Sequence, residues 1–262
     1  MNARQLCVYH LPSDVAEREL ADSAVIVIDL LRASTTISQA LASGAREVVP
    51  FLEIDDVMAA LRDQDRSQIV LGGERSGGKI KDFDLGNSPS EYTPDAVRGR
   101  RVFITTTNGT RALHHARLAR RILVGCVVNI SAVAASIQDE RRVNILCAGT
   151  GREETREDIL AAGGFVTWLE QQWDRPPEMN DQAVAARGEW QKVLAAAGAA
   201  NRSISEQFAM ELRDTQGGRS LLGIGLDRDL VDCAQVDRLD IVAELDVREW
   251  RITSPLSQNP PR

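Results

Sequence analysis

Four polar segments that directly follow apolar runs hold most of the residues that could do chemistry. They are Asp29–Thr36 (DLLRASTT), Gly72–Lys79 (GGERSGGK), Thr105–Thr110 (TTTNGT) and Cys147–Arg152 (CAGTGR). Three of them lead into predicted helices, whose first turns present unpaired N–H groups and the positive end of the helix dipole. These features favour a small ligand with several anionic groups, although hydroxyl-rich residues also cap ordinary helices.

Asp29 is the carboxylate best placed for catalysis, because it ends the wholly apolar run AVIVI. A carboxylate there is partly desolvated and needs a metal ion, a cation or hydrogen bonds. It could attack phosphorus as a nucleophile, or it could bind Mg²⁺ that polarises a phosphoryl group. The sequence leaves both roles open. As a cap of the helix predicted from Thr35, Asp29 would lie several residues too early.

Charged residues near these segments could complete an anion site. Arg32, Arg75 and Arg111 carry forked donors that suit phosphate, although surface arginines are ordinarily solvated. Glu157 and Asp158 could be further Mg²⁺ ligands, or they could simply stabilise a helix N-terminus.

Residues 73–79 (GERSGGK) also fit the G-x-x-x-x-G-K pattern of a nucleotide-binding P-loop. The pattern requires Ser or Thr next, followed by a helix. Here Ile80 follows, and Gly and Pro occur in the next stretch, KDFDLGNSPSEYTP. We therefore predict a flexible anion-binding loop, with a P-loop NTPase as a rival interpretation.

The elements that must position these residues alternate between strands and helices. Short Val- and Ile-rich runs predict strands at residues 5–9, 24–30, 46–51, 68–72, 101–106, 121–127 and 142–148. The intervening stretches, residues 35–44, 54–64, 108–119 and 129–138, predict helices. From about residue 155 the pattern is helical, over residues 158–173, 181–197 and 203–215, before two final strands at 239–245 and 247–252.

This order predicts a three-layer α/β fold in which helices flank a mixed, mostly parallel sheet and the helical second part packs on it. We expect a single domain over residues 1–252 and a C-terminal tail over 253–262. Ligands of open α/β sheets bind beyond the carboxyl ends of the strands, where the four polar segments lie.

Composition narrows the class of protein. A net charge of −7 over 262 residues argues against nucleic acid as a partner. The start, MNARQLCVYHL, lacks the design of a secretion signal, and no later apolar run approaches the roughly 20 residues that cross a bilayer. We therefore expect a cytoplasmic protein without a membrane partner. Three histidines and four widely spaced cysteines argue against zinc and leave Mg²⁺ as the expected metal.

Five ordered stretches resemble the 2-phosphosulfolactate phosphatase family, a family of magnesium-dependent acid phosphatases. They read IDLLRASTT, GGERSGGKIKDFDLGNSPSEY, TTTNGTRAL, ILCAGT and EDILAAG, span residues 28–163, and are joined by a weaker match over residues 223–245. The resemblance implies hydrolysis of (2R)-2-phospho-3-sulfolactate to 3-sulfolactate and phosphate, a step toward coenzyme M. After Cys147–Gly149 this chain continues TGREETRED, which is more charged than is typical of the family.

The resemblance also implies a set of site residues, together with Mg²⁺ as cofactor. Its catalytic members are Asp29, Arg32 and Glu74. Its substrate-binding members are Ser34, Thr35, Asn87, Ser88, Thr106, Thr107 and Asn108, and Asp84 lies in a matching stretch. Its metal ligands are Asp29, Glu157 and Asp158. Two alternatives stay open: a phosphatase for another phosphorylated hydroxy acid, and a non-catalytic organophosphate-binding protein. A homodimer is also an expectation.

Overall fold

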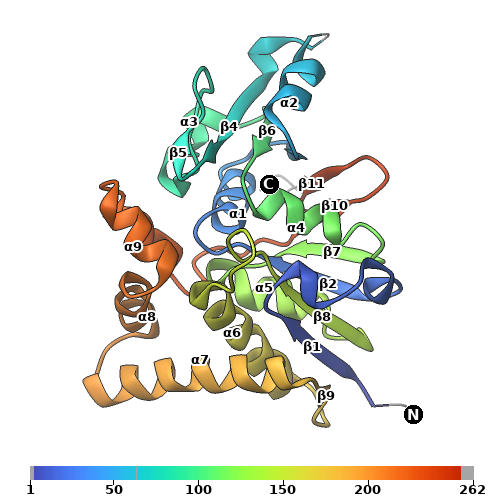
Figure 1. Ribbon diagram of the computed structural model, residues 1–262, viewed down its shortest axis with the longest axis vertical. Coiled ribbons are helices and arrows are strands. Elements are labelled where there is room, and N and C mark those ends of the chain that lie inside the picture. Colours follow the sequence, from blue (N-terminus) through green and yellow to red (C-terminus); the bar gives the residue numbers. More distant parts are fainter. Residues whose placement is uncertain (1–2, 63, 255–262) are drawn as a thin grey trace, which may run out of the picture.

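An eleven-stranded sheet runs through the molecule (Figure 1). The structure is a computed structural model and describes residues 3–62 and 64–254. The spatial order of the strands is β5-β4-β6-β3-β11-β10-β7-β2-β8-β1-β9. Their bounds are β1 Gln5–Tyr9, β2 Ala24–Ile28, β3 Glu47–Phe51, β4 Ile69–Arg75, β5 Gly78–Lys79, β6 Arg101–Thr105, β7 Arg121–Val124, β8 Arg142–Cys147, β9 Glu178–Met179, β10 Ala243–Asp246 and β11 Arg251–Thr253.

Two parallel sets of strands make up most of this sheet. One set is β4-β6-β3, and the other is β7-β2-β8-β1 with β9 at its edge. The antiparallel pair β10–β11 joins them, so that the two sets run in opposite senses along the sheet. Strand twist turns one set across the other, and in Figure 1 their carboxyl ends meet near the centre of the molecule. The predicted mixed, mostly parallel α/β sheet is confirmed.

Helices cover both faces of the sheet and form the second part of the chain. The α-helices are α1 Ala33–Ala42, α2 Ile54–Leu61, α3 Pro94–Val97, α4 Gly109–His115, α5 Ile130–Ser136, α6 Arg156–Gln172, α7 Asp181–Ala200, α8 Ile204–Arg213, α9 Gln216–Gly223 and α10 Asp227–Cys233. Short 3₁₀ helices are η1 Pro12–Asp14, η2 Glu17–Leu20, η3 Arg66–Gln68, η4 Pro89–Glu91 and η5 Val127–Asn129. Among the described residues, none of these helices has both the length and the apolar character needed to cross a bilayer.

The burial of β2 on both faces explains why helices pack on both sides of the sheet. Its sequence AVIVI has no polar residue, and all five side chains are buried. Since successive side chains point to opposite faces of a strand, Val25 and Val27 join the core that includes α1 and α4. Ile26 and Ile28 join the core formed with α5 and α6. A strand that is apolar on both faces must lie in the interior of the sheet, which places Asp29 at the interior end of that strand.

Close packing of α6 against α7 attaches the helical second part to the sheet. A β-carbon added to Gly163 of α6 would lie 2.0 Å from the carbonyl oxygen of Ala186 in α7. Only glycine therefore allows the two backbones to approach this closely. The contact thereby fixes the position of α6, whose first turn contains Glu157 and Asp158.

We expect Gly163→Ala to lower the free energy of unfolding by about 1–3 kcal/mol, because the new methyl group forces the two helices apart. Gly188→Ala is the matched control, since Gly188 lies in α7 with no atom within 4 Å of an added β-carbon. That change should stabilise the protein by about 0.5–1 kcal/mol. Urea unfolding followed by circular dichroism measures both. Equal effects of the two substitutions would contradict the observed packing.

Several predicted elements differ from the observed ones. The final strands are shorter than predicted, because residues 239–242 pass beside η5 without entering the sheet, where the N–H of Leu239 donates to the Val128 carbonyl. Thr253, placed in the predicted tail, ends β11, and residues 255–262 of that tail lie outside the described residues. The two-residue strands β5 and β9 were not predicted.

The segment resembling a P-loop is a hairpin. Residues Glu74 and Arg75 of β4 pair antiparallel with Gly78 and Lys79 of β5. A P-loop requires a helix directly after Lys79, and none follows. The P-loop NTPase interpretation is therefore wrong. Residues 74–79, predicted as a flexible anion-binding loop, form a β-hairpin.

Candidate active site

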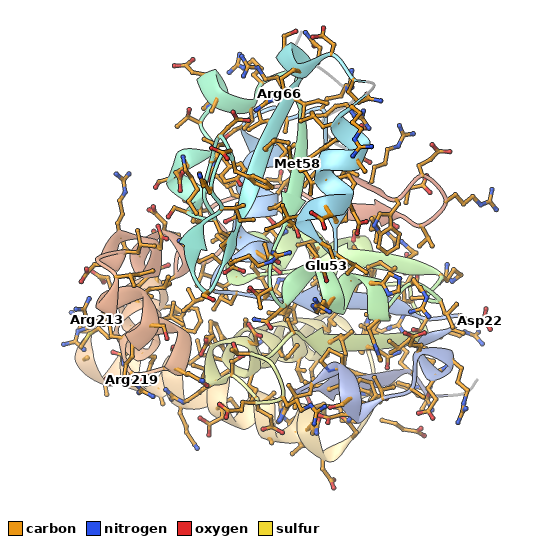
Figure 2. All side chains as sticks on the ribbon, turned by 45° about the horizontal axis from the view of Figure 1, so that its top comes forward. Asp22, Glu53, Met58, Arg66, Arg213 and Arg219 are labelled. Carbon is orange, nitrogen blue, oxygen red and sulfur yellow. The ribbon has the colours of Figure 1, made fainter. Side chains whose placement is uncertain are left out.

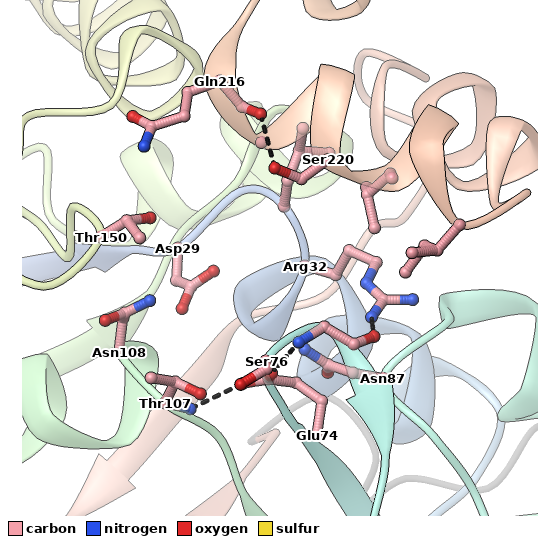
Figure 3. Close-up of a pocket in the computed structure, with 15 residues that line it drawn as sticks. Asp29, Arg32, Glu74, Ser76, Asn87, Thr107, Asn108, Thr150, Gln216 and Ser220 are labelled. Atoms are coloured by element: carbon pink, nitrogen blue, oxygen red, sulfur yellow. Dashed lines mark hydrogen bonds between the residues drawn. The ribbon is translucent and has the colours of Figure 1, made fainter.

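A cavity of about 290 Å³ lies where the carboxyl ends of the two strand sets meet (Figure 3). All four polar segments that follow strands contribute to its wall. The lining residues from these segments include Asp29, Arg32, Glu74, Thr107, Asn108 and Thr150. Asn87 adds an amide, and α9 adds Gln216, Gly217 and Ser220. The predicted convergence of these segments is therefore confirmed, but it depends on sheet twist because the strand sets run in opposite senses.

Asp29 is held between the first turns of two helices. Its Oδ1 accepts the N–H of Ala33 at 3.3 Å, and its own N–H donates to Ser34 Oγ at 2.8 Å. Its Oδ2 faces Gly109, where an added β-carbon would lie only 2.8 Å away. Helix α1 begins at Ala33, two residues before the predicted start. Asp29 therefore contacts the first turn of this helix, although the sequence placed it several residues too early to be a cap.

The environment of Asp29 raises its pKa. Desolvation is the largest cause, and it raises the pKa from 3.8 to about 6 although backbone N–H groups of Ala33 and Gly109 act in the opposite direction. The charges of Glu74 and Glu157 contribute to this rise in the pKa. A carboxylate in such surroundings is unstable as a bare anion, so it favours a nearby cation or a reactive role.

Arg32 is a buried cation that is already paired. Its Nη1 donates to Asp229 Oδ2 at 2.7 Å and to Ser88 Oγ at 3.0 Å, and its Nη2 donates to the Gly77 carbonyl at 2.8 Å. Arg32 and Asp229 are each only 3% exposed. Within the described part of the chain, Nε and the second Nη2 hydrogen have no protein acceptor. Arg32 can therefore donate to an anion in the cavity while Asp229 fixes its orientation.

Glu74 connects two walls of the cavity. One carboxylate oxygen accepts the N–H of Gly77 at 2.7 Å, and the other accepts the N–H of Thr107 at 2.7 Å. The carboxylate thus ties the β4–β5 hairpin to the segment after β6. Glu74, which was predicted as a catalytic residue, thus holds the backbone of Thr107 in position at the cavity.

Two amide side chains complete the polar wall. Asn87 is buried, and its Oδ1 has no hydrogen-bond partner in the part of the chain that the structure describes, while Thr36 Oγ1 donates to its backbone carbonyl at 2.7 Å. Asn108 Oδ1 accepts the N–H of Gly151 at 3.2 Å, which joins the segments after β6 and β8. Both predicted substrate-binding amides therefore lie at the cavity.

Most of the hydroxyl side chains that were predicted to bind substrate form hydrogen bonds with other groups of the protein. Ser34 Oγ receives the N–H of Asp29, Thr35 Oγ1 donates to the Leu30 carbonyl, and Ser88 Oγ donates to Asp229. Thr106 Oγ1 accepts the N–H of Thr110. These side chains are buried and shape the segments that surround the cavity. Thr107 is exposed and lines the cavity itself.

The predicted metal ligands beyond Asp29 are buried beneath the cavity. Asp158 Oδ1 accepts the N–H of Leu30, and its Oδ2 accepts from Gly149 and Thr155. Desolvation and the charge of Asp29 raise the pKa of Asp158 well above its usual range. With both oxygens occupied by backbone and hydroxyl donors, Asp158 fixes the segments after β2 and β8 instead of presenting a free oxygen.

Glu157 presents an oxygen that is unpaired among the described residues. Its Oε1 accepts the N–H of Gly217 in α9 at 3.0 Å, whereas no residue of 3–62 or 64–254 hydrogen-bonds to its buried Oε2. Burial also raises the pKa of Glu157. Within the described residues, no three acidic, histidine or cysteine side chains gather as a metal site by themselves. The predicted trio Asp29, Glu157 and Asp158 therefore does not form a complete site.

Asp84, which belongs to one of the stretches that resemble the family, lies away from the cavity. Its two oxygens pair with Arg66 Nη2 at 2.7 and 2.6 Å, and one of them accepts the N–H of Leu71. Figure 2 shows Arg66 at the outer end of the β4–β6 set. Asp84 thus holds the edge of the sheet.

Residues of α9 and α10 were missed by the sequence prediction. Gln216, Gly217 and Ser220 line the cavity, and Asp229 orients Arg32. The signal available for α9 was Thr215, a capping hydroxyl, followed after Gln216 by two glycines that can start a helix. No local signal marks Asp229, because it lies 197 residues from its partner.

Fold and site together define an α/β protein with a polar cavity, built from strand-end segments and helix N-termini, that is lined by a partly buried carboxylate and by an arginine held in an ion pair. A sequence profile of the 2-phosphosulpholactate phosphatase family matches residues 9–247. The chain belongs to this family, whose members are phosphoric monoester hydrolases.

Curated relatives agree over nearly the whole chain, and each carries the name probable 2-phosphosulfolactate phosphatase. The chain is 35% identical to the protein of Caldanaerobacter subterraneus subsp. tengcongensis, over 92% of this chain and 95% of the relative. It is 38% identical to that of Symbiobacterium thermophilum, over 86% and 91%. It is 35% identical to that of Thermosynechococcus vestitus, over 96% and 98%.

Proposed function

We propose that this protein is a Mg²⁺-dependent phosphatase that hydrolyses (2R)-2-phospho-3-sulfolactate to 3-sulfolactate and phosphate. The observation that carries the proposal is the convergence of Asp29, Arg32 and Asn108 on one cavity at the carboxyl ends of the strands. The names of the relatives support the choice of substrate. A step toward coenzyme M is the corresponding metabolic role.

Charge balance at the cavity supports a metal requirement. Among the lining residues, Arg32 is the cation and Asp29 and Glu74 are carboxylates. Arg32 is itself neutralised by Asp229. A substrate with phosphate, carboxylate and sulfonate groups would therefore meet an uncompensated negative site without an added cation.

Asp29 and the unpartnered Oε2 of Glu157 are the protein oxygens that fit Mg²⁺. Mg²⁺ is typically held by one or two carboxylates, with substrate phosphate oxygens and water completing six ligands. Such an ion would polarise the phosphoryl group and offset the charge of the transition state.

The protein's own residues bind and orient the ester. The free donors of Arg32 and the amide of Asn108 would hold phosphoryl oxygens, while Glu74 keeps Thr107 in place against the same group. In one case Asp29 attacks phosphorus: the ester P–O bond breaks, 3-sulfolactate leaves and takes up a proton, and water then hydrolyses the aspartyl phosphate. In the other case Asp29 would hold the metal and an activated water would attack. Acid quenching during turnover would trap a phosphorylated protein only in the first case.

Phosphate release from purified protein tests the function. We expect turnover of 2-phospho-3-sulfolactate with Mg²⁺ and its loss with EDTA, restored when Mg²⁺ is added in excess. Equal rates with Mg²⁺ and with EDTA would exclude the metal role. Binding of the ester without release of phosphate under any metal condition would instead indicate an organophosphate-binding protein.

A further inference from the structure

A second cavity of about 250 Å³ adjoins the catalytic one and shares Asn108 with it. Its other lining residues include Arg111 and His115 of α4, together with Ala148, Gly151 and Arg152 after β8. We call it the Arg152 cavity. Because Asn108 forms part of both walls, a ligand that is bound at Asp29 and extends past Asn108 would enter the Arg152 cavity.

Arg152 lies in an exposed turn. Thr150 and Glu153 exchange backbone hydrogen bonds of 2.9 and 3.1 Å, so that Gly151 and Arg152 form a two-residue hairpin loop. Gly151 has φ of 65°, a conformation that glycine adopts without strain. The hydrogen bond from the Gly151 N–H to Asn108 Oδ1 then fixes this loop to the catalytic segment.

The charges at the Arg152 cavity are unequally compensated. Arg111 donates to Glu53 Oε1 at 2.7 Å, so part of its charge is already balanced. In the part of the chain that the structure describes, Arg152 has no hydrogen-bond or ion-pair partner. The two nearest acidic neighbours in sequence are engaged elsewhere, Glu153 with Gln216 and Glu154 with His10. The cavity therefore offers an uncompensated guanidinium beside the catalytic site of a protein with a net charge of −7.

We infer that the Arg152 cavity binds the acidic group of the substrate that is most distant from the phosphoryl group, a sulfonate or a carboxylate. This inference rests on the proposed function. A guanidinium binds such planar or tetrahedral oxyanions through two parallel N–H donors.

Two esters that differ only in the distal group test this inference. We expect the wild-type protein to favour 2-phospho-3-sulfolactate over 2-phospholactate by about 10- to 100-fold in kcat/KM, the range of a charge-assisted hydrogen bond. In Arg152→Gln this preference should fall by about tenfold, mainly through KM. Arg152→Lys should retain part of it. Arg175→Gln, which removes an exposed arginine from the turn before β9, is the control and should leave the preference unchanged.

The inference would be overturned if Arg152 acted only by attracting anions at long range, without binding the distal group. In that case Arg152→Gln would lower kcat/KM for both esters by the same factor, and the effect would fade as salt is added. Thermal unfolding of each variant confirms that the exposed substitution has left the fold intact.

Failure of the proposed function gives a different result. If the wild-type protein hydrolyses neither ester, calorimetry with malate and lactate still tests the cavity, because malate carries an acid group where lactate has a methyl group. Tighter binding of malate, lost in Arg152→Gln, supports the inference. Equal affinities for the two acids in the wild-type protein would overturn it.

Discussion

Asp29→Asn should abolish turnover and at the same time stabilise the metal-free protein. The substitution removes the carboxylate that the proposed mechanism needs, so we expect kcat to fall by at least about 1000-fold. The amide oxygen of asparagine can still accept the N–H of Ala33, which preserves the start of α1. Since asparagine carries no charge, the cost of desolvating an ionised carboxylate disappears.

The gain in stability should depend on pH. Burial raises the pKa of Asp29 from 3.8 to about 6 in the folded protein, so the folded state holds this proton more tightly than the unfolded state. That contribution to stability is fully present below about pH 4 and is lost as the pH rises through about 6. The full difference corresponds to about 3 kcal/mol at most. Relative to wild type, Asp29→Asn should therefore be stabilised by about 1–3 kcal/mol above pH 6 and by almost nothing at pH 4.

Urea unfolding at pH 4, 6 and 8 in EDTA measures this difference. Adding Mg²⁺ at pH 8 should stabilise the wild-type protein and leave Asp29→Asn unchanged, because a ligand stabilises only the state that binds it. A variant that is less stable than wild type at pH 8 would show that the Asp29 carboxylate is favourably solvated. A variant with full activity would remove Asp29 from the mechanism.

Breaking the pair between Arg32 and Asp229 should have the largest effect on folding. Asp229→Asn leaves the guanidinium of Arg32 buried without its counter-ion, and we expect a loss of about 3–5 kcal/mol in the free energy of unfolding. Activity should fall as well, because Asp229 and Ser88 orient Arg32 toward the cavity. Urea unfolding and phosphate release measure the two effects.

The double substitution Arg32→Met with Asp229→Leu separates stability from catalysis. Replacing a buried ion pair by apolar side chains is often neutral or stabilising, so the double variant should regain most of the lost stability. It should remain inactive, because it has no cation at that side of the cavity. Asp227→Asn is a control in the same helix, since the Asp227 side chain is 60% exposed and pairs loosely with Arg213. A loss below about 1 kcal/mol in Asp229→Asn would contradict the buried pair.

Only part of the site could be predicted from sequence, and the division has a physical basis. Asp29, Thr107 and Asn108 follow apolar strands, and strand periodicity alone places them at strand ends. Glu74 and Asp158 were recognised as polar residues of interest, yet their function in the fold is to accept backbone N–H groups from other segments. Local sequence cannot show which distant donors a carboxylate will meet.

The helical second part illustrates the same limit. Three of its helices, α6, α7 and α8, were predicted from their periodicity, whereas α9 and α10 were not. The contribution of α9 to the cavity depends on how these helices pack against one another. That packing requires the close approach at Gly163. The identity of Asp229 as the partner of Arg32 likewise depends on the packing of α10 against α8, α9 and η4.

The amino-acid sequence by itself determined the α/β class, the strands that precede Asp29 and Thr107, and the family, because these depend on local periodicity and on ordered motifs. The tertiary structure decided how the strand ends meet. The antiparallel pair β10–β11 reverses one set of strands, and only the accumulated twist of the sheet brings both sets of carboxyl ends to one cavity. Twist and long-range pairing are properties of the assembled sheet, so no single segment encodes them.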